Sequence, residues 1–437
     1  MKDCEFILSA PYLVTQNDAR EIIENGSIAV DNGLIVDIGP RESVAANWSG
    51  RTNLDYADAL IMPGLINAHT HSAMTFLRGL ADDLPLMDWL NKAVFPVEAR
   101  LNPEIVRLGS LLGCAEMLAT GTTACVDMYI FEDAVFAAAK EAGIRCMGGE
   151  AVFSFPSAAA AGPEEALEIT EDLAAKYADD PLISVAVNPH SVYTTESSVL
   201  RACADLALKR NLPLHIHLAE TRRETALCLE KHGLRPVARA AENGIFEARV
   251  LAAHLVDINN DEVRFLAAKK AVPVHNPASN MKLASGVASV PMMLEAGLPV
   301  ALGTDGPASN NTLNMFREMN RAALLGKVWS GDPAALPAGA VFDMASRSGA
   351  VAMNDPRLGS LETGKAADLA VIDTSGPHAR PFYDAASLIV YALSGHECRL
   401  TMVDGKIRYR DGRFDFDYDG LLREAGRLKN FVLAKIS

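Results

Sequence analysis

From residue 60 the chain alternates short apolar, β-branched runs with longer segments of helical periodicity. Segments such as 103–120 and 164–177 contain good helix formers and repeat their apolar positions with a helical period. The short runs read as buried strands and cover 60–69, 121–128, 144–150, 183–190, 212–220, 250–257, 271–277 and 298–305. Strand–helix alternation repeated eight times over roughly 250 residues predicts a (β/α)₈ barrel of the TIM type. An open doubly wound sheet is the alternative, but it usually has a Gly-rich phosphate turn after its first strand, and this chain has none.

The two flanks of this region have a different pattern. Residues 1–59 and 360–437 contain short alternating strands with hairpin signals at Asp31-Asn32-Gly33 and Asp404-Gly405. Both ends of the chain are therefore expected to meet in one small domain, a β-sandwich, beside a catalytic barrel of residues 60–359.

Composition narrows the possible partners. The 437-residue chain is 49% hydrophobic and 22% charged, with a formal net charge of −15. This charge disfavours nucleic acid and anionic membranes as partners and leaves small molecules open. The start of the chain lacks the pattern of a signal peptide, and no apolar run is long enough to cross a membrane. The seven cysteines form no CxxC pair, which favours a reducing compartment such as the cytoplasm. We also expect the protein to be a homo-oligomer.

Most of the predicted strands end in a side chain capable of chemistry. His69 and His71 are two residues apart, so on a strand both rings face the same side. Such a pair is either a hydrogen-bonded polar pair or half of a metal site. In a barrel the carboxyl ends of the strands form one mouth, where active sites lie. The other strand ends carry Asp127, Glu150, His190, His217, His254, His275 and Asp305, of which Asp127 and His275 are equally well explained as cap or core residues.

Four segments carry a specific resemblance. PGLINAHTH (63–71), HLAE (217–220), the histidine of AAHLVD (252–257) and GTDGPASNN (303–311) resemble the amidohydrolase superfamily. More narrowly, they are similar to its deaminases of 5′-methylthioadenosine and S-adenosylhomocysteine. The resemblance extends over nearly the whole chain and implies a metal-dependent hydrolase that releases ammonia from an adenine nucleoside.

The resemblance also implies a metal site. In the superfamily the ligands correspond to His69, His71, His217 and Asp305, and a catalytic metal keeps one position open for water. His215 competes with His217, because HIH again places two rings on one face of a strand. Binuclear relatives use a carboxylated lysine on the fourth strand, and ISVAVNPH (183–190) contains no lysine. One divalent metal per subunit is expected, with zinc first and iron or manganese as alternatives.

Three residues receive catalytic roles from the resemblance. Glu220 would protonate a ring nitrogen, His254 would hold the hydroxide or the tetrahedral intermediate, and Asp305 would carry a proton from water to the departing amine. Taken alone, Glu220 could equally be a carboxylate at a helix N-terminus, and His254 could be a buried histidine.

The substrate-side residues are implied in the same way. A carboxylate at Glu98 would accept hydrogen bonds from both ribose hydroxyls, and His190 would contact the nucleoside, together with Glu220 and Asp305. By itself Glu98 reads as an ordinary surface residue. Relatives that bind S-adenosylhomocysteine well carry arginines after the third strand, whereas 148–162 has Glu150 and Phe153 and no arginine. With Trp89, which could also be core, these residues favour 5′-methylthioadenosine, while adenosine and S-adenosylhomocysteine remain possible.

Two other functions stay open on sequence grounds. The first is a deaminase or chlorohydrolase of a free purine, pyrimidine or triazine base on the same scaffold, which would not need Glu98 because a free base has no diol. The second is a non-catalytic binding protein on a degenerate barrel, which would be expected to have lost some of the four ligands.

Overall fold

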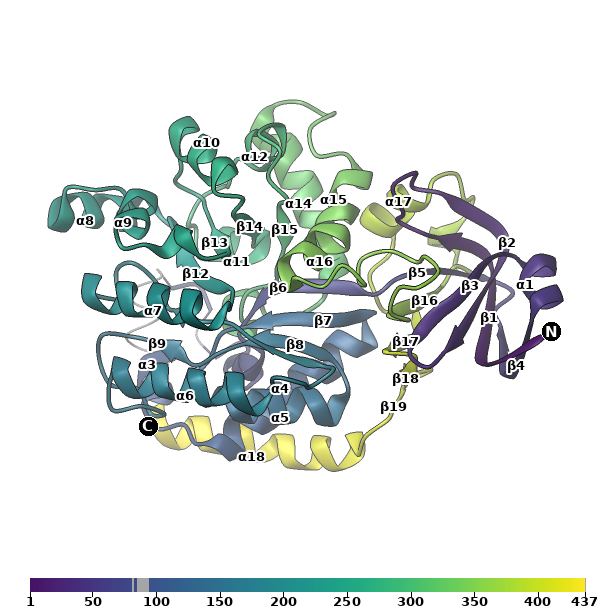
Figure 1. The fold of residues 1–437 in the computed structure, drawn as a ribbon, viewed down its shortest axis with the longest axis horizontal. Coiled ribbons are helices and arrows are strands. Elements are labelled where there is room, and N and C mark those ends of the chain that lie inside the picture. Colours follow the sequence, from purple (N-terminus) through teal and green to yellow (C-terminus); the bar gives the residue numbers. More distant parts are fainter. Residues whose placement is uncertain (81, 85–93, 437) are drawn as a thin grey trace.

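The computed structural model describes residues 1–80, 82–84 and 94–436 of the chain (Figure 1). A larger part, in which helices surround a set of strands, adjoins a smaller part built around a sheet that contains the N-terminal strand. The C-terminus lies beneath the larger part.

The larger part contains two four-stranded parallel sheets that follow the chain order. One runs β10-β8-β7-β6 and the other β12-β13-β14-β15. Val187 and Leu214 form a parallel bridge between them, and the backbone of Asp305, just after β15, donates to the carbonyl of His69 at 3.0 Å. The strands are β6 (Leu65–Thr70), β7 (Thr122–Asp127), β8 (Arg145–Gly148), β10 (Ile183–Val185), β12 (Leu214–Leu218), β13 (Val250–His254), β14 (Val272–His275) and β15 (Ala301–Leu302). All eight predicted strand runs are therefore present, and the last lies beside the first.

Helices connect these strands as the periodicity predicts. Several have clear start signals: Asn102 accepts from the backbone of Ile105 at the start of α4, and Asn259 forms a capping box with Glu262 at the start of α10. Between β6 and residue 360, the α-helices that the structure describes are α3 (Phe95–Glu98), α4 (Pro103–Ala119), α5 (Glu132–Ala142), α6 (Pro163–Lys176), α7 (Ser197–Arg210), α8 (Arg222–His232), α9 (Pro236–Glu242), α10 (Asn260–Ala268), α11 (Pro277–Lys282), α12 (Val290–Glu295), α13 (Pro307–Asn310), α14 (Met315–Ser330), α15 (Ala338–Ala345) and α16 (Arg347–Met353).

The first predicted strand, residues 60–69, is divided at Gly64. Its first half belongs to β5 (Ala59–Pro63), which pairs with β1 (Lys2–Val14) and β16 (Leu369–Asp373) in the smaller part, and only its second half forms β6. A Cβ at Gly64 would lie 2.1 Å from the Thr123 hydroxyl, so a side chain here would displace β7. The glycine lets the chain pass from one sheet into the other in a single residue.

The chain's two flanks contribute to one nine-stranded sheet. Its order is β19-β18-β17-β16-β5-β1-β2-β3, with β4 (Trp48–Asp55) paired to β1. The predicted hairpins connect β2 (Ile22–Asp31) to β3 (Leu34–Pro40) and β17 (Cys398–Val403) to β18 (Lys406–Arg410), and β19 is Arg413–Phe414. Asn32, Gly33, Asp404 and Gly405 all have positive φ, as two-residue hairpin turns require. The strand pairing joins all nine strands in one sheet, so the two-sheet sandwich stays a prediction.

The C-terminal flank also contains a long helix that the strand pattern did not predict. The helix α18 (Tyr418–Ile436) runs beneath the larger part and packs against α4 (Figure 1). A buried ion pair also joins the two parts, because the Arg145 guanidinium bonds both carboxylate oxygens of Asp368 at 2.9 and 3.0 Å and also Asp404 at 2.8 Å.

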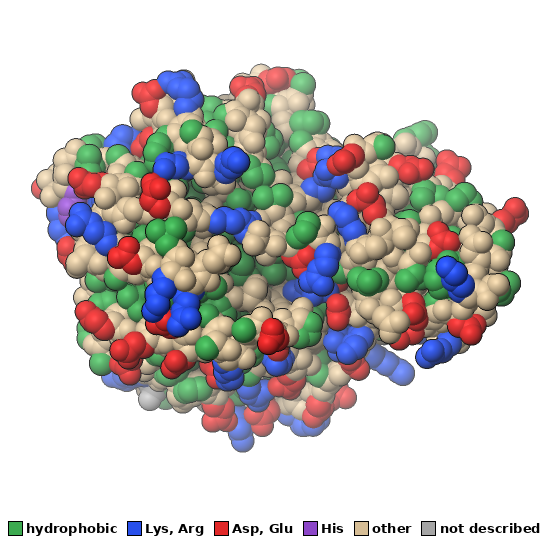
Figure 2. All heavy atoms as spheres, in the orientation of Figure 1, with side chains coloured by type: hydrophobic (Ala, Val, Ile, Leu, Met, Phe, Trp, Pro, Cys, Tyr) green, Lys and Arg blue, Asp and Glu red, His purple; other side chains and the backbone are tan. Residues whose placement is uncertain are grey.

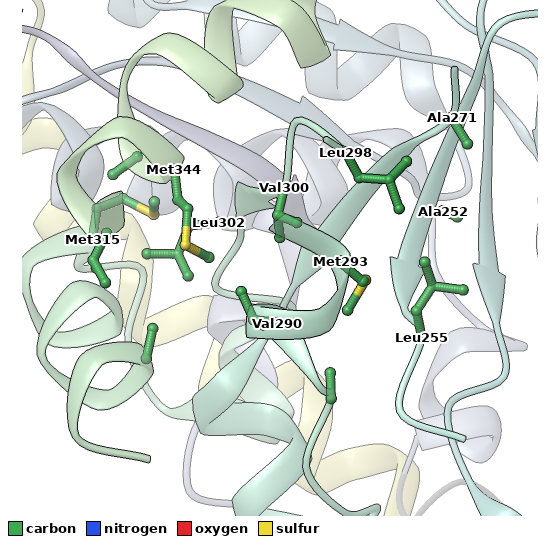
Figure 3. Close-up of a cluster of buried hydrophobic side chains, with 14 of the residues drawn as sticks. Ala252, Leu255, Ala271, Val290, Met293, Leu298, Val300, Leu302, Met315 and Met344 are labelled. Carbon is green, nitrogen blue, oxygen red and sulfur yellow. The ribbon is translucent and has the colours of Figure 1, made fainter. Parts of the chain in front are cut away.

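Apolar side chains fill the space between the strands and the outer helices. Figure 3 shows one such region, in which Val290 and Met293 of α12 lie among Leu298, Val300 and Leu302 of the following segment. Within the described residues, no helix is long and apolar enough to cross a membrane.

Candidate active site

The polar residues at several strand ends converge on one place. His69 lies on β6, His217 on β12 and His254 at the end of β13, while His71 directly follows β6 and Asp305 lies in the loop after β15. All of these side chains are buried. His254, Asp305 and Ala219, which follows β12, have positive φ values of 76°, 60° and 52°. Non-glycine residues rarely adopt this conformation, and these three lie where the strand-end side chains turn toward a common centre.

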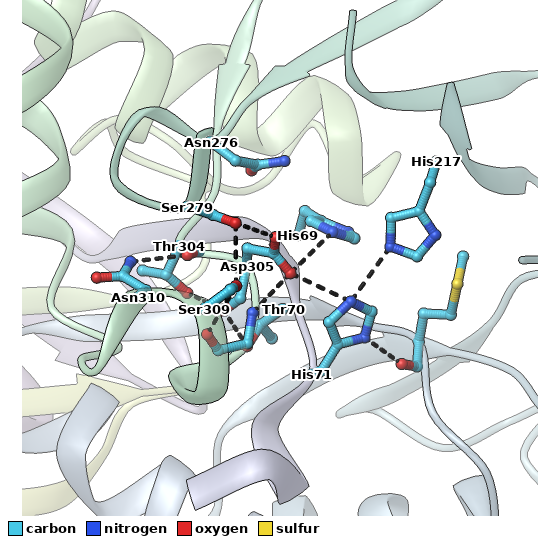
Figure 4. Close-up of polar contacts among 12 residues, drawn as sticks. His69, Thr70, His71, His217, Asn276, Ser279, Thr304, Asp305, Ser309 and Asn310 are labelled. Atoms are coloured by element: carbon cyan, nitrogen blue, oxygen red, sulfur yellow. Dashed lines mark hydrogen bonds and ion pairs between the residues drawn. The ribbon is translucent and has the colours of Figure 1, made fainter. Parts of the chain in front are cut away.

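Four of these residues form a compact donor set (Figure 4). The Nε2 atoms of His71 and His217 are 3.2 Å apart, and Asp305 Oδ1 is 3.2 Å from His71 Nε2 and 3.6 Å from His69 Nε2. The ligand atoms of His69, His71 and His217 lie within 4.8 Å of one another, as do those of His69, His254 and Asp305. Three imidazoles and a carboxylate around one point are a donor set that a divalent transition metal accepts.

The other ring nitrogens are held so that the Nε2 atoms face inward. His71 Nδ1 donates to the Met128 carbonyl at 2.5 Å, and His217 Nδ1 donates to the His190 carbonyl at 2.7 Å. Neutral rings of this tautomer present Nε2 lone pairs to each other, and His69 Nε2 has no hydrogen-bond partner. Buried acceptors that face one another need a cation between them, so the residues present fit a bound metal.

The pKa values of the donor set also favour a bound cation. Burial lowers the pKa of His71, but the Asp305 carboxylate outweighs this effect and raises it to about 9. Burial raises the pKa of Asp305, yet the neighbouring imidazoles of His69 and His71 hold it well below its ordinary value. The pocket therefore stabilises positive charge among the nitrogens and a carboxylate in its ionised form.

The structure separates the two histidines of the HIH segment. His217 lines the cavity, whereas His215 lies behind His69, with its Nε2 2.9 Å from His69 Nδ1. His215 thus supports a candidate ligand from behind, which is a common role for a second residue at metal sites.

Each candidate catalytic residue has a neighbour that fixes its orientation. Ser279 Oγ donates to Asp305 Oδ2 at 2.6 Å. His254 Nδ1 donates to Asn280 Oδ1 at 2.9 Å, which leaves its Nε2 4.0 Å from Asp305 Oδ2. These neighbours, which the sequence analysis missed, belong to the segment HNPASNMKLASG (275–286), where small polar residues follow β14 and form the start of α11.

Glu220 faces the same cavity from the end of β12. Its carboxylate accepts a hydrogen bond from the Ser285 hydroxyl at 3.3 Å, and burial raises its pKa. A carboxyl group with a raised pKa retains its proton at higher pH, as a proton donor must.

A cavity of about 420 Å³ opens in front of the donor set. Glu98 lines it, accepts from the Tyr129 hydroxyl at 2.8 Å, and has a pKa raised by burial. His190 lines it too, held by Thr194 at 2.9 Å, and burial lowers its pKa to about 3, so the ring is neutral. Of the residues named from the sequence, the cavity walls include His71, Glu98, Phe153, His190, His217, Glu220, His254 and Asp305.

Other predicted residues are not in the cavity. Contrary to the prediction, Glu150 is turned away, and its two oxygens accept from the backbone of Phe131 and Glu132 at 3.1 and 3.0 Å, at the start of α5. Asp127 accepts from the backbone of Ser72 at 2.7 Å, and His275 is buried on β14. Trp89 lies outside the described residues.

The cavity also has walls that the sequence analysis did not select. Tyr129, Tyr193 and Leu283 all lie on segments that follow strands of the larger part. The ring of Phe155 stacks on Phe153 with centroids 5.0 Å apart, and Phe153 in turn lies 4.8 Å from the ring of His190. An apolar side chain in a loop carries no signal of its own in a single sequence, because loop direction is set by tertiary packing.

Comparison with known proteins agrees with this geometry. The model of the amidohydrolase family matches residues 60–408. A protein of Desulfovibrio desulfuricans named 5-methylthioadenosine/S-adenosylhomocysteine deaminase is 58% identical over 99% of this chain and 98% of its own. A protein of the same name from Lawsonia intracellularis is 52% identical over 99% and 98%.

Solved structures show the same relationship. An adenosine deaminase from Xanthomonas campestris with bound zinc superposes with a TM-score of 0.97, at 36% identity and 99% coverage of both chains. The zinc complex of atrazine chlorohydrolase from Arthrobacter aurescens has a TM-score of 0.88 at 23% identity, covering 97% of this chain and all of that one, which shows a shared fold. The chain belongs to the amidohydrolase family and, within it, to the group of the 5-methylthioadenosine/S-adenosylhomocysteine deaminases.

Proposed function

We propose that this protein hydrolytically deaminates an adenine nucleoside to the inosine analogue and ammonia, with 5′-methylthioadenosine as the preferred substrate. The observation that carries the proposal is a donor set open to a cavity whose walls also carry Glu220 and Glu98. The names of the relatives support the same reaction.

His69, His71, His217 and Asp305 would hold one divalent metal, for which zinc is the first choice because two similar structures carry it. When bound, the metal supplies the Lewis acidity that makes a water molecule a nucleophile at neutral pH. No lysine lies on β10, which supports a single ion.

The remaining chemistry is proton transfer by two carboxyl groups in different environments. Burial keeps the proton on Glu220 available for a ring nitrogen of the base. Asp305 stays ionised beside the imidazoles, so it can accept a proton and later deliver it to the departing amine. His254, fixed by Asn280, directs its Nε2 toward Asp305 and would steady the oxygen that adds to the base.

Glu98 supports a nucleoside rather than a free base. Its Oε1 already accepts from Tyr129, and a carboxylate retains further acceptor positions for a vicinal diol. Among the described residues this half-buried carboxylate has no basic partner, and its desolvation is costly unless a ligand supplies donors.

The cavity walls support a neutral 5′ substituent. Among the described residues that line it, none is a lysine or an arginine, and Phe153 and Phe155 form an apolar stack. A methylthio group suits such a wall, whereas the charged tail of S-adenosylhomocysteine would lose hydration without gaining a partner. Glu150 does not contribute to this preference, because its carboxylate lies at the start of α5.

We further infer that the larger part is a closed (β/α)₈ barrel and that residues 1–59 and 360–437 form a second domain. The contact between Asp305 and His69 supports closure, and the shared nine-stranded sheet supports a composite domain. Homo-oligomerisation and a cytoplasmic location stay predictions.

Ammonia release from a panel of compounds tests the proposed function. The panel holds 5′-methylthioadenosine, adenosine, S-adenosylhomocysteine, adenine, guanine, cytosine and a chlorotriazine, each with the metal-loaded enzyme. We expect the highest kcat/KM for 5′-methylthioadenosine and little turnover of free bases. A free base or triazine as the best substrate would overturn the proposal.

A further inference from the structure

A second cleft lies directly beside the active-site cavity. It has a volume of about 830 Å³ and shares the walls Tyr193, Glu220 and Leu283 with that cavity. Its remaining walls come from Val192, from Thr221 and α8, from Arg239 of α9 and from the segment 283–285, which follows α11. None of the residues that we assign to the ribose or the 5′ substituent borders it, so the cleft lies on the Glu220 side of the active site.

The cleft contains a buried cation without a counter-ion. Arg239 is 3% exposed, and no carboxylate of the described residues forms an ion pair with it. One terminal nitrogen of its guanidinium bonds His232, and the other donates to the Thr195 carbonyl at 3.1 Å. Its Nε has no partner. Burying a guanidinium without an anion is unfavourable, so a bound anion would complete this environment.

Further basic side chains surround Arg239. Arg222 and Arg223 are exposed on α8, border the cleft and take part in no ion pair within the described residues, and Lys231 pairs only with the exposed Glu196. Basic side chains and a histidine are visible at the α8 end of the molecule (Figure 2). The protein as a whole has a net charge of −15, so a basic cleft runs against its overall charge.

The acidic residues that border the cleft do not cancel this charge. Glu224 accepts from the backbone of Ala219 and Glu220 at 3.1 and 2.6 Å. Burial and then the neighbouring Glu220 raise the pKa of Glu224 to about 8, so it is largely neutral at pH 7. Besides Glu220, which the cleft shares with the active-site cavity, this leaves Glu230 as an exposed carboxylate against three arginines and a lysine.

We propose that this cleft binds a small organic anion, a carboxylate or phosphate with an apolar body, as a ligand separate from the nucleoside substrate. Arginine forks match the oxygens of either anion, and Val192, Leu227 and Leu283 offer apolar wall for the rest of the molecule. The bound anion would lie against the wall that carries Glu220, which the two cavities share.

Binding to the metal-loaded enzyme tests the site without relying on catalysis. Inorganic phosphate and succinate are titrated by calorimetry into wild type, R222Q/R223Q, R239Q and R201Q. Arg201 is a matched control, because it is an exposed arginine on α7 that does not border the cleft and forms no ion pair among the described residues. R222Q/R223Q keeps the test valid if R239Q fails to fold, since both of its positions are exposed.

We expect at least one of the two anions to bind wild type and R201Q with a Kd below about 1 mM. Binding should weaken about tenfold or more in R222Q/R223Q and R239Q, as loss of charge-assisted hydrogen bonds predicts. Equal binding in all four proteins would overturn the proposed site, because the anion would then bind elsewhere, for example phosphate at the metal. The absence of binding of either anion to wild type would overturn it as well.

A kinetic arm distinguishes the source of the anion. Values of kcat/KM for 5′-methylthioadenosine and S-adenosylhomocysteine are compared in wild type and R222Q/R223Q without added anion. If the ligand is separate, the ratio of the two values is unchanged. A selective loss for S-adenosylhomocysteine would show that the cleft holds the tail of the substrate and would refute a separate ligand.

Discussion

Replacing Glu98 with alanine separates a nucleoside enzyme from an enzyme of free bases. The Glu98 carboxylate lines the cavity and, within the described residues, accepts one hydrogen bond, from the Tyr129 hydroxyl at 2.8 Å. Its other lone pairs are open to the cavity, where the ribose of a bound nucleoside would offer two hydroxyl donors. The side chain is not in the candidate donor set, so metal content should not change.

The expected magnitude follows from the number of hydrogen bonds lost. Hydrogen bonds to a charged group are worth about 1.5–3 kcal/mol each, and water entering the vacated space recovers part of this. A loss of about 1.4 kcal/mol is tenfold in kcat/KM, so adenosine should lose about ten- to several-hundredfold. With 2′-deoxyadenosine the loss should be smaller, because one donor is missing in wild type as well.

The assay measures kcat/KM for adenosine and 2′-deoxyadenosine by ammonia release, with metal analysis of each preparation. Tyr129→Phe is the matched variant: it keeps the ring and the carboxylate but removes the hydroxyl that holds Glu98, so its loss should be smaller than that of Glu98→Ala. The reasoning is refuted if Glu98→Ala reduces both nucleosides equally, since Glu98 would then act on something other than the diol.

Further predictions concern the metal, the proton donor, the substrate and the interface between the two parts. Metal analysis should find close to one transition metal per chain, with loss in His217→Ala, and two ions per chain would contradict the single-site interpretation. Glu220→Gln should lower kcat by ~10²–10⁴. Because burial raises the pKa of Glu220, the wild-type rate should fall as pH rises through that pKa, and a variant with near-wild-type turnover would remove Glu220 from the mechanism. 5′-Methylthioadenosine should exceed S-adenosylhomocysteine in kcat/KM by about tenfold or more, and equal values would mean that a cation reaches the cavity. Arg145→Ala should lower the free energy of unfolding by about 3–5 kcal/mol in denaturant titrations, because Asp368 would be left buried and unpaired; an unchanged midpoint would show that this ion pair does not hold the two parts together.

Much of the fold could be predicted because its signals are local. The eight parallel strands and the hairpins at Asp31-Asn32-Gly33 and Asp404-Gly405 depend on apolar runs and turn residues that are contiguous in the sequence. The division at Gly64 was missed, because an apolar run of ten residues does not reveal that its halves belong to different sheets. The helix α18 was also missed, since its apolar face has meaning only against α4.

The candidate site was predictable where its residues lie at the carboxyl ends of strands. His69, His71, His217, His254 and Asp305 meet because parallel strands bring their carboxyl ends to the same edge. The orienting residues Ser279 and Asn280 were not identified, because a serine or an asparagine after a strand is far more often a cap than a partner of a catalytic group.

The sequence by itself therefore determined which residue types stand at the strand ends and in what order, since strand period and chain order suffice for that. Only the tertiary structure decided where each side chain points. Glu150 ends a predicted strand just as His190 does, yet two backbone N–H groups at the start of α5 hold its carboxylate away from the cavity. His215 and His217 share one face of β12, yet one lies behind His69 and the other in the cavity. Direction at a strand end depends on which buried donors and acceptors lie within reach, and these come from segments distant in the chain.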